Sequence, residues 1–518
     1  MTAPAETLRA TYLVSEHDGD PEAAARRIAY EQTVELPEAL VTERAILDGV
    51  VGRVESITRL GDDDRRHLAT IAYPLGGVDP QFPALLNLLF GNASLLSGTR
   101  LVDIQLPDVL LEQFAGPRYG AVGLRALTGV HDRPLLATAL KPRGRDDASL
   151  AALAGAFARG GGDIVKDDQN LADDFESFKR RALAAQDAVE EANAATGRRC
   201  LYLPHASARF ADLERCFEFA AARGMAGVLV CPMITGLETL RDLAARYPLA
   251  VMAHPALTSV EGRDASRGLA PGVLWGTLFR LAGADVSIFP HPGGRFPFSH
   301  ADGQAIAAAL RAPLGRLAAA LPAPAGGMNL ERVPELCAAY GNDAVLLVGG
   351  ALFGLDADVT VATQRFLDAM RAVTGERLAA PAAPGAPARG YHLAAGADFN
   401  WAGRESSPYK DAADLAFRGV RRVELVGKHG EPSRTDLRYF EVEPGGYSSL
   451  ERHVHGHIVI GARGSGVLVQ GGARRPLAVN DVAWIAPLEA HQLLNESAQP
   501  FGFFCIVDHR RDRPMTVD

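Results

Sequence analysis

The sequence contains few cysteines and no paired cysteine motif. Five occur among 518 residues: Cys200, Cys216, Cys231, Cys337 and Cys505. Their number is odd and they are widely scattered, which argues against a disulfide framework as the basis of the fold. We therefore expect reduced thiols with mostly structural roles.

The sequence also lacks a long apolar run and an excess of positive charge. Residues 1–12 show no basic segment followed by an apolar one, and no apolar run approaches the roughly 20 residues that span a bilayer. The 53 lysines and arginines are outnumbered by 62 aspartates and glutamates, so the formal net charge is −9. We therefore expect a soluble, cytoplasmic protein with a small-molecule substrate, and neither a nucleic-acid nor a membrane partner.

Lysine is scarce as well. Only Lys141, Lys166, Lys179, Lys410 and Lys428 occur, so arginine carries nearly all of the positive charge. A lysine can transfer a proton or form a carbamate, which arginine cannot do. A lysine at the end of a strand is therefore a candidate for chemistry, although chance is the plainer reading of any single one.

The middle of the chain alternates short apolar runs with segments of helical period. The runs are 134–140, 163–168, 200–205, 227–233, 249–254, 284–289, 321–326 and 344–349. Eight buried runs separated by helices predict an α/β fold, a (β/α)8 barrel over 119–376. Functional residues should then follow the strands at the carboxyl end of the barrel.

Two further domains flank this barrel, in keeping with a length that allows roughly three domains. Residues 1–118 mix strand-like and helix-like segments and predict an α+β domain. Residues 377–398 include the stretch AAPAAPGAPARG, which is typical of a linker. Residues 399–518 carry short strands with glycine turns and predict a small all-β barrel.

The predicted strand ends of the central barrel carry polar residues and glycine pairs. They are Lys141 after the first strand, Lys166, Asp168 and Gln169 after the second, His205, His254 and His291 after the third, fifth and sixth, and Gly326–Gly327 and Gly349–Gly350 after the last two. A glycine pair after these last strands is typical of a phosphate site. With lysines and acids opposite, the pattern favours a phosphorylated substrate stretched across the barrel mouth.

Seven motifs in order resemble the ribulose bisphosphate carboxylase superfamily. They are GNAS, FAGPRYGAVGLR, PLLATALKPRGR, GGGDIVKDDQN, AHPAL, AGGM and VGGALFG, spread over about residues 5–375. The resemblance implies that Lys166 takes up CO2 as a carbamate and binds Mg2+ with Asp168 and Gln169. It also implies proton transfer by Lys141, and a homodimer in which Asn92 reaches the neighbouring subunit's site.

Departures from that pattern narrow the class. No lysine occurs from 180 to 409, where carboxylases place the loop lysine that holds CO2, and Pro255 stands where they carry a phosphate-binding arginine. The chain therefore resembles the RuBisCO-like proteins (form IV) and not a CO2-fixing carboxylase. Asn92 replaces the lysine base of the related enolases, which weakens an enolase reading. Gln169 replaces a metal carboxylate, so Mg2+ affinity should fall and carbamylation of Lys166 stays open.

The C-terminal segment concentrates histidines. His453, His455 and His457 alternate in ERHVHGH and should share one strand face, and His491 follows on a later strand. Four imidazoles suit a divalent first-row metal such as Mn2+. The pattern resembles the cupin metal motif over 446–464 and 481–495, with Glu451 or His457 in place of the usual glutamate.

The two resemblances together imply consecutive reactions on one chain. RYFEVEPGGYSSLERH resembles small cupins that act on a methylthio-sugar phosphate, the 1-methylthioxylulose 5-phosphate methylsulfurylases. The barrel would isomerise 5-methylthioribulose 1-phosphate to 1-methylthioxylulose 5-phosphate, and the cupin would remove the methylthio group with a thiol such as glutathione, in methylthioadenosine metabolism (methionine salvage). The catalytic residues would be Lys141, Lys166, His254 and Asn92, with His291 and the glycine pairs at the phosphate.

Two alternatives remain at this point. The barrel could act as an enolase or decarboxylase of another phosphorylated keto sugar or sugar acid, with the same site residues. In a different class, the cupin could be a ligand sensor attached to an inactive barrel. Intact Lys141, Lys166 and Asp168 argue against an inactive barrel, because a dead site has no physical need for buried lysines.

Overall fold

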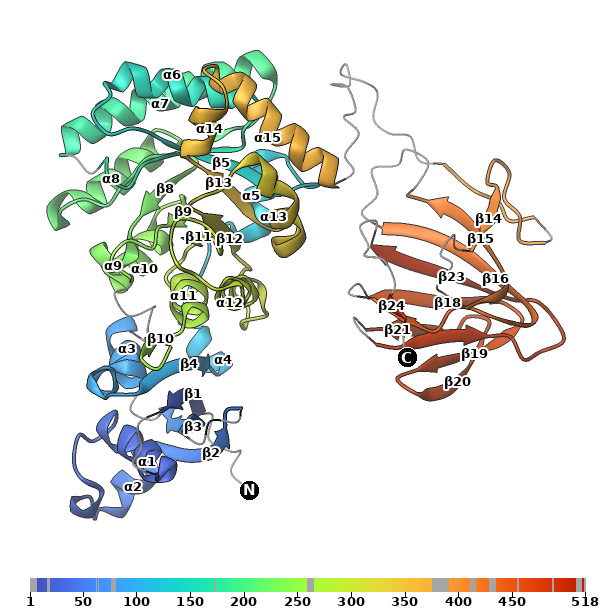
Figure 1. Cartoon of the computed structure of the whole chain (residues 1–518), viewed down its shortest axis with the longest axis horizontal. Helices are drawn as coiled ribbons and strands as arrows, with labels where there is room; N and C mark the ends of the chain where they lie inside the picture. Colours follow the sequence, from blue (N-terminus) through green and yellow to red (C-terminus); the bar gives the residue numbers. More distant parts are fainter. Residues whose placement is uncertain are drawn as a thin grey trace. The chain divides into compact units, whose positions relative to one another are not determined.

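The computed structural model of the chain contains two compact units, Met1–Leu378 and Ala379–Asp518 (Figure 1). It describes residues 7–15, 19–61, 63, 65–75, 81–171, 174–258, 265–374, 391–396, 398–409, 416–427, 435–453, 456–486, 489–508 and 515–516. Most of the linker predicted at 377–398 lies outside these residues. The division of the first unit into domains 1–118 and 119–376 stays a prediction.

The N-terminal part of the first unit is built on a five-stranded sheet of order β10-β4-β1-β3-β2. Its strands are β1 (Thr7–Val14), β2 (Arg53–Arg59), β3 (His67–Pro74), β4 (Thr99–Gln105) and β10 (Gly268–Leu269). The helices are α1 (Pro21–Glu31), η1 (Glu38–Leu40), α2 (Arg44–Gly49), α3 (Phe82–Phe90), η3 (Asn92–Leu95) and α4 (Asp108–Leu111). Strand β1 alternates buried and half-buried residues, as expected for a sheet with one face in the core.

The rest of the first unit is a parallel barrel, which confirms the predicted fold class. The eight strands are β5 (Leu135–Leu140), β6 (Ile164–Asp167), β7 (Leu201–Leu203), β8 (Gly227–Val230), β9 (Ala250–Ala253), β11 (Val286–Pro290), β12 (Leu321–Ala325) and β13 (Val345–Val348). Each falls within one of the eight predicted runs or overruns it by a single residue. A bridge between His205 and Leu229 joins the chain after β7 to β8 and closes the ring.

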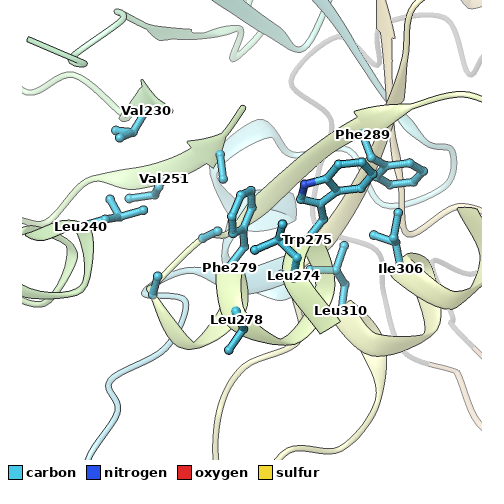
Figure 2. Close-up of a cluster of buried hydrophobic side chains, with 14 of the residues drawn as sticks. Val230, Leu240, Val251, Leu274, Trp275, Leu278, Phe279, Phe289, Ile306 and Leu310 are labelled. Carbon is cyan, nitrogen blue, oxygen red and sulfur yellow. The ribbon is translucent and has the colours of Figure 1, made fainter. Parts of the chain in front are cut away.

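Helices surround these strands. They are α5 (Gly120–Thr128), α6 (Asp147–Arg159), α7 (Phe175–Thr196), α8 (Phe210–Ala222), α9 (Pro232–Thr235), α10 (Leu237–Arg246), the π-helix η5 (Gly272–Leu278), α11 (Phe279–Leu281), α12 (His300–Arg311), η6 (Leu330–Arg332), α13 (Val333–Tyr340), α14 (Gly350–Leu355) and α15 (Val359–Thr374). Figure 2 shows how η5, α11 and α12 place Trp275, Phe279 and Leu310 in an apolar layer with side chains of the neighbouring strands. The strands are therefore buried on both faces, by this layer outside and by the packed barrel interior inside.

The second unit is all-β over the residues that the structure describes, as predicted. Its strands are β14 (Ser406–Pro408), β15 (Arg418–Val426), β16 (Thr435–Tyr447), β17 (Glu451–Arg452), β18 (His457–Arg463), β19 (Ser465–Gln470), β20 (Ala473–Ala478), β21 (Val482–Ile485), β22 (His491–Leu494), β23 (Phe501–Asp508) and β24 (Met515–Thr516). One sheet of main order β20-β19-β22-β16-β23-β18-β21 folds around an apolar core. In the described parts of both units, no helix is apolar and long enough to cross a bilayer.

Candidate active site and metal site

A cavity of about 900 Å³ opens at the carboxyl end of the barrel strands. Eight of the residues predicted for this site line it: Lys141, Lys166, Gln169, His254, Gly326, Gly327, Gly349 and Gly350. They come from β6 and from the segments after β5, β6, β9, β12 and β13, so residues far apart in sequence meet because parallel strands end together. The structure thus brings these eight residues together, and their roles stay predictions.

Lys166 is the most deeply buried charged side chain of this cavity. It is the third residue of β6 and only 2% exposed. Its Nζ donates a hydrogen bond to the carbonyl oxygen of Asp167 at 3.0 Å. Burial lowers the pKa of Lys166 to about 8. A substantial fraction of this amine is therefore neutral near pH 8, and only a neutral amine can accept a proton or add to CO2.

The two acids after Lys166 have different roles. Asp167 is fully buried and accepts hydrogen bonds from Arg181 Nε, the Tyr202 hydroxyl and the His205 backbone N–H, so it holds the strand ends together. Asp168 is buried and does not itself line the cavity, but its Oδ2 lies 2.8 Å from Nζ of Lys141, which does. Burial alone would raise the pKa of Asp168, but the bond from Lys141 and the Asn170 backbone N–H hold it below its usual range. Asp168 is therefore an ionised carboxylate beside a lysine.

The three predicted histidines are placed differently. His254 lines the cavity, and its Nδ1 accepts a hydrogen bond from the Ala256 N–H at 3.1 Å, which leaves the proton on Nε2. Burial lowers its pKa to about 3, so it is neutral. His205 lies behind the site with its Nε2 3.7 Å from Cys231 Sγ. His291 is buried against Tyr340 and does not line the cavity within the described residues.

Asn92 lies in the N-terminal part, outside the cavity of its own chain as far as the structure describes it. It begins η3, and its Nδ2 donates to Glu31 Oε1 at 2.8 Å and to Glu35 Oε1 at 3.0 Å. Its predicted role in a neighbouring subunit stays a prediction.

The cavity has a second, apolar side that sequence reasoning missed. Aromatic rings of Trp275, Phe289, Phe296 and Phe298 line it, and Trp275 and Phe298 lie 5.6 Å apart, centroid to centroid. Trp275 is on the π-helix η5, and the other three lie on or after β11. A π-helix is rare and often occurs at a functional site, but the sequence pattern did not predict one here.

Comparisons with known proteins agree with this geometry. The family model for the ribulose bisphosphate carboxylase large chain, catalytic domain, matches residues 120–289. A 5-methylthioribulose-1-phosphate isomerase of Rhodospirillum rubrum is 43% identical over 366 residues, which are 70% of this chain and 96% of the relative. The chain belongs to the RuBisCO-like proteins.

Two further RuBisCO-like proteins show the spread of this family. A 2,3-diketo-5-methylthiopentyl-1-phosphate enolase of Geobacillus thermodenitrificans is 34% identical over 391 residues, 72% of this chain and 94% of the relative. The crystal structure of a Rubisco-like protein from Rhodopseudomonas palustris is 38% identical with a TM-score of 0.64, over 72% of this chain and 99% of that chain. Each of these matches leaves uncovered a part of this chain that is about as long as its second unit.

The buried histidines of the RuBisCO-like unit predict acid sensitivity. Burial lowers the pKa of His205 and of His291 to about 4, whereas an unfolded histidine titrates near 6.5. The unfolded state therefore binds protons first as the pH falls, and each histidine should cost about 2 kcal/mol of unfolding free energy between pH 7 and pH 5. Urea titrations followed by helical circular dichroism measure this, since the described helices all lie in the first unit.

Two variants test this acid sensitivity. Between pH 7 and pH 5, the unfolding free energy of His291→Gln should fall by about 2 kcal/mol less than that of the wild type, because a glutamine does not titrate. His300→Gln removes an exposed histidine whose charge is only a minor cause of the lowered pKa of His291, so it should change the pH dependence far less than His291→Gln. Equal pH dependence in all three proteins would contradict the assignment of His291 as a neutral buried residue.

In the second unit, three histidines converge. The metal-binding nitrogens that His453, His457 and His491 can offer all lie within 4.8 Å of one another, and the three side chains are buried. His491 Nδ1 lies 2.9 Å from the Glu489 carbonyl oxygen, and His457 Nδ1 lies 3.2 Å from Cys505 Sγ. An outward bond at Nδ1 fixes the ring and leaves Nε2 as the nitrogen for a metal.

The prediction that the histidines of ERHVHGH alternate along one strand is wrong. Strand β17 ends at Arg452 and pairs with β22 and β24, whereas β18 begins at His457 and pairs with β21 and β23. His453 and His457 therefore meet because the chain changes partner strands between them. His455 lies outside the described residues. Of the two side chains left open, His457 belongs to the triad, while Glu451 accepts a hydrogen bond from Ser449 Oγ at 2.6 Å.

Proposed function

We propose that the RuBisCO-like unit converts 5-methylthioribulose 1-phosphate to 1-methylthioxylulose 5-phosphate by enolisation and proton transfer. The observation that carries this proposal is that the buried Lys166 lines one cavity with Lys141, which is paired with Asp168. The relative of 43% identity that carries the isomerase name supports the substrate. More generally, the named relatives support an enzyme of methionine salvage that acts on a phosphorylated keto sugar.

The reaction moves the carbonyl from C2 to C4 in two steps. A base removes the C3 proton to give an enediolate, which is reprotonated at C2, and the same sequence then operates at C4 and C3. The neutral fraction of Lys166 suits the base, and the Lys141 ammonium, held by Asp168, stabilises the enediolate oxygen and can return a proton. His254 Nε2–H can donate to a substrate oxygen and orient it.

A metal ion would add to this charge stabilisation. The oxygen donors of Asp168 and Gln169 suit a hard cation, and the buried, pKa-lowered Lys166 can become the third ligand as a carbamate. When bound, Mg2+ would polarise the substrate carbonyl. If Lys166 carries the carbamate, the base would be its carbamate oxygen.

The aromatic side of the cavity favours a substrate with an apolar end. A thioether makes favourable contacts with aromatic rings, and Trp275, Phe289 and Phe298 line this side of the cavity. A second phosphate group would form no favourable contact with these aromatic rings. This supports a methylthio-sugar monophosphate over a sugar bisphosphate, and it supports the enolase alternative equally.

The enolase and decarboxylase alternatives keep the same residues. The enolase of Geobacillus thermodenitrificans supports the first of them at 34% identity. Against it stands Asn92, where the enolases carry a lysine base. A sensor function for the second unit on an inactive barrel predicts no turnover at all.

We also propose that the second unit is a cupin metalloenzyme that binds Mn2+ or another divalent first-row metal at His453, His457 and His491. It would remove the methylthio group with a thiol such as glutathione and leave 1-deoxyxylulose 5-phosphate. The buried imidazole triad and its outward hydrogen bonds support the metal.

A homodimer with shared sites is part of this proposal. Large apolar side chains are exposed after successive barrel strands, namely Phe210, Met233, Ile234, Leu257 and Phe296. Exposed apolar groups that surround a site mark an interaction surface. A neighbouring subunit that brings Asn92 to this face would cover them. A cytoplasmic location stays a prediction.

A proton and phosphorus NMR time course in D2O tests the proposed function. Full-length protein with 5-methylthioribulose 1-phosphate should give a new ketose phosphate with deuterium on carbon. Added glutathione should then give 1-deoxyxylulose 5-phosphate. Exchange and product only from the diketo-methylthiopentyl phosphate would move the assignment to the enolase, and no exchange with any of these phosphates would favour the sensor.

A further inference from the structure

The charged side chains that line the cavity are all cationic within the described residues. They are Lys141, Lys166 and Arg295. Lys141 pairs with Asp168, and Lys166 donates to a backbone carbonyl in the interior. Arg295 forms no ion pair with any residue that the structure describes, and its guanidinium lies over the Phe296 ring at 5.0 Å. An arginine without a carboxylate partner at the wall of a cavity can pair with an anion that enters it.

Arg295 lies on a loop whose backbone rests directly on the loop after β12. A Cβ on Gly294 would collide with the carbonyl oxygen of Gly326, and a Cβ on Gly327 would come within 2.8 Å of Gly294 Cα and 3.2 Å of the Arg295 nitrogen. His291 N also donates to the Ala325 carbonyl at 2.8 Å. The glycines at 294 and 327 therefore bring the arginine backbone against the Gly326–Gly327 segment.

A second arginine, Arg332, donates hydrogen bonds to the backbone of this loop. Arg332, at the end of η6, donates from Nη1 to the Gly293 carbonyl at 2.7 Å and from Nη2 to the Pro292 carbonyl at 3.1 Å. The loop that carries Arg295 is thus held at two consecutive carbonyls. Arg332 acts as a positioning residue, because its own charge is directed at the backbone and at Glu335.

We propose that Arg295 binds the phosphate group of the substrate at the Gly326–Gly327 segment, and this rests on the proposed function. A guanidinium matches two phosphate oxygens at once, which a lysine cannot do. Gly326 and Gly327 line the cavity together with Arg295, and their φ angles of 83° and 86° are ones that glycine adopts without strain. The rest of the substrate would then extend into the same cavity, which Lys166 also lines.

Binding of inorganic phosphate to the full-length protein tests this assignment without turnover. The measurement is a phosphorus NMR or calorimetric titration at constant ionic strength, because exposed charges are screened by salt. Arg295→Gln should weaken phosphate binding by about 10- to 100-fold, the usual cost of a lost charged hydrogen bond. Arg223→Gln is the matched control, since Arg223 is also exposed and also lies over a phenylalanine ring, but outside the described cavity lining.

Steady-state kinetics with the sugar phosphate provide the second readout. Arg295→Gln should raise KM by a similar factor with a smaller change in kcat, and Arg295→Lys should recover part of the loss. Equal phosphate binding by wild type and Arg295→Gln, or no phosphate binding by the wild type, would overturn the assignment. Arginine-dependent phosphate binding without turnover of the sugar phosphate would leave it standing and reject the proposed function instead.

Discussion

Replacing Lys166 with methionine should reduce isomerisation about 1,000-fold or more. The amine is the one group of this cavity that combines burial with a pKa near 8, so its loss removes the base and the carbamate site together. Methionine has a similar length and no charge to bury, so the fold should survive. Enzyme assays and thermal unfolding of the full-length variant measure both effects.

A matched lysine is available as a control for this variant. Lys179, on α7, is partly exposed, pairs with Glu176 and lies over the Phe175 ring. Lys179→Met should keep full activity. With 13C-labelled CO2, a carbamate resonance should appear in the wild type and in Lys179→Met and be missing in Lys166→Met. Full activity of Lys166→Met would reject its catalytic role, and activity without any carbamate signal would leave Lys166 as an amine base.

The barrel could be predicted because its strands carry their signal locally. Strands β8, β9 and β13 are buried at every residue, and each is an unbroken run of apolar residues between helical segments. Strand β10 has no such signal. Its two residues, Gly268–Leu269, form a strand only because β4 lies beside them, more than 160 positions away in the chain. Contacts of that kind depend on the completed fold.

The residues of the candidate site likewise fall into those that the sequence could predict and those that depend on the completed fold. Lys141 and the glycine pairs follow strands directly and Lys166 lies near the end of β6, so parallel strands that end together were enough to bring them into one cavity. Arg295, Phe296 and Phe298 lie on the loop after β11, whose backbone contacts the Gly326–Gly327 segment, and Trp275 lies on a π-helix, so strand ends could not predict these positions. In the second unit the histidines were found from their number and spacing, but strand alternation was the wrong reason, because the chain changes partners between β17 and β18.

Replacing His491 with alanine should remove the metal from the second unit. The three imidazoles lie at mutual ring distances of 4.9 Å, so each supplies one of only three described ligands, and the loss of one should weaken binding by more than about 100-fold. Elemental analysis after dialysis against Mn2+ measures the bound metal. The wild type should also unfold at a higher temperature with metal than without it, and His491→Ala should not.

His392→Ala is the matched control, because His392 belongs to the same unit and is exposed. It should retain the metal and the thermal shift. The thiol-dependent step should disappear in His491→Ala while isomerisation continues, since the isomerisation residues all lie in the other unit. Metal retained at wild-type level in His491→Ala would reject the triad as the site. Loss of both reactions would instead show that the two units depend on each other.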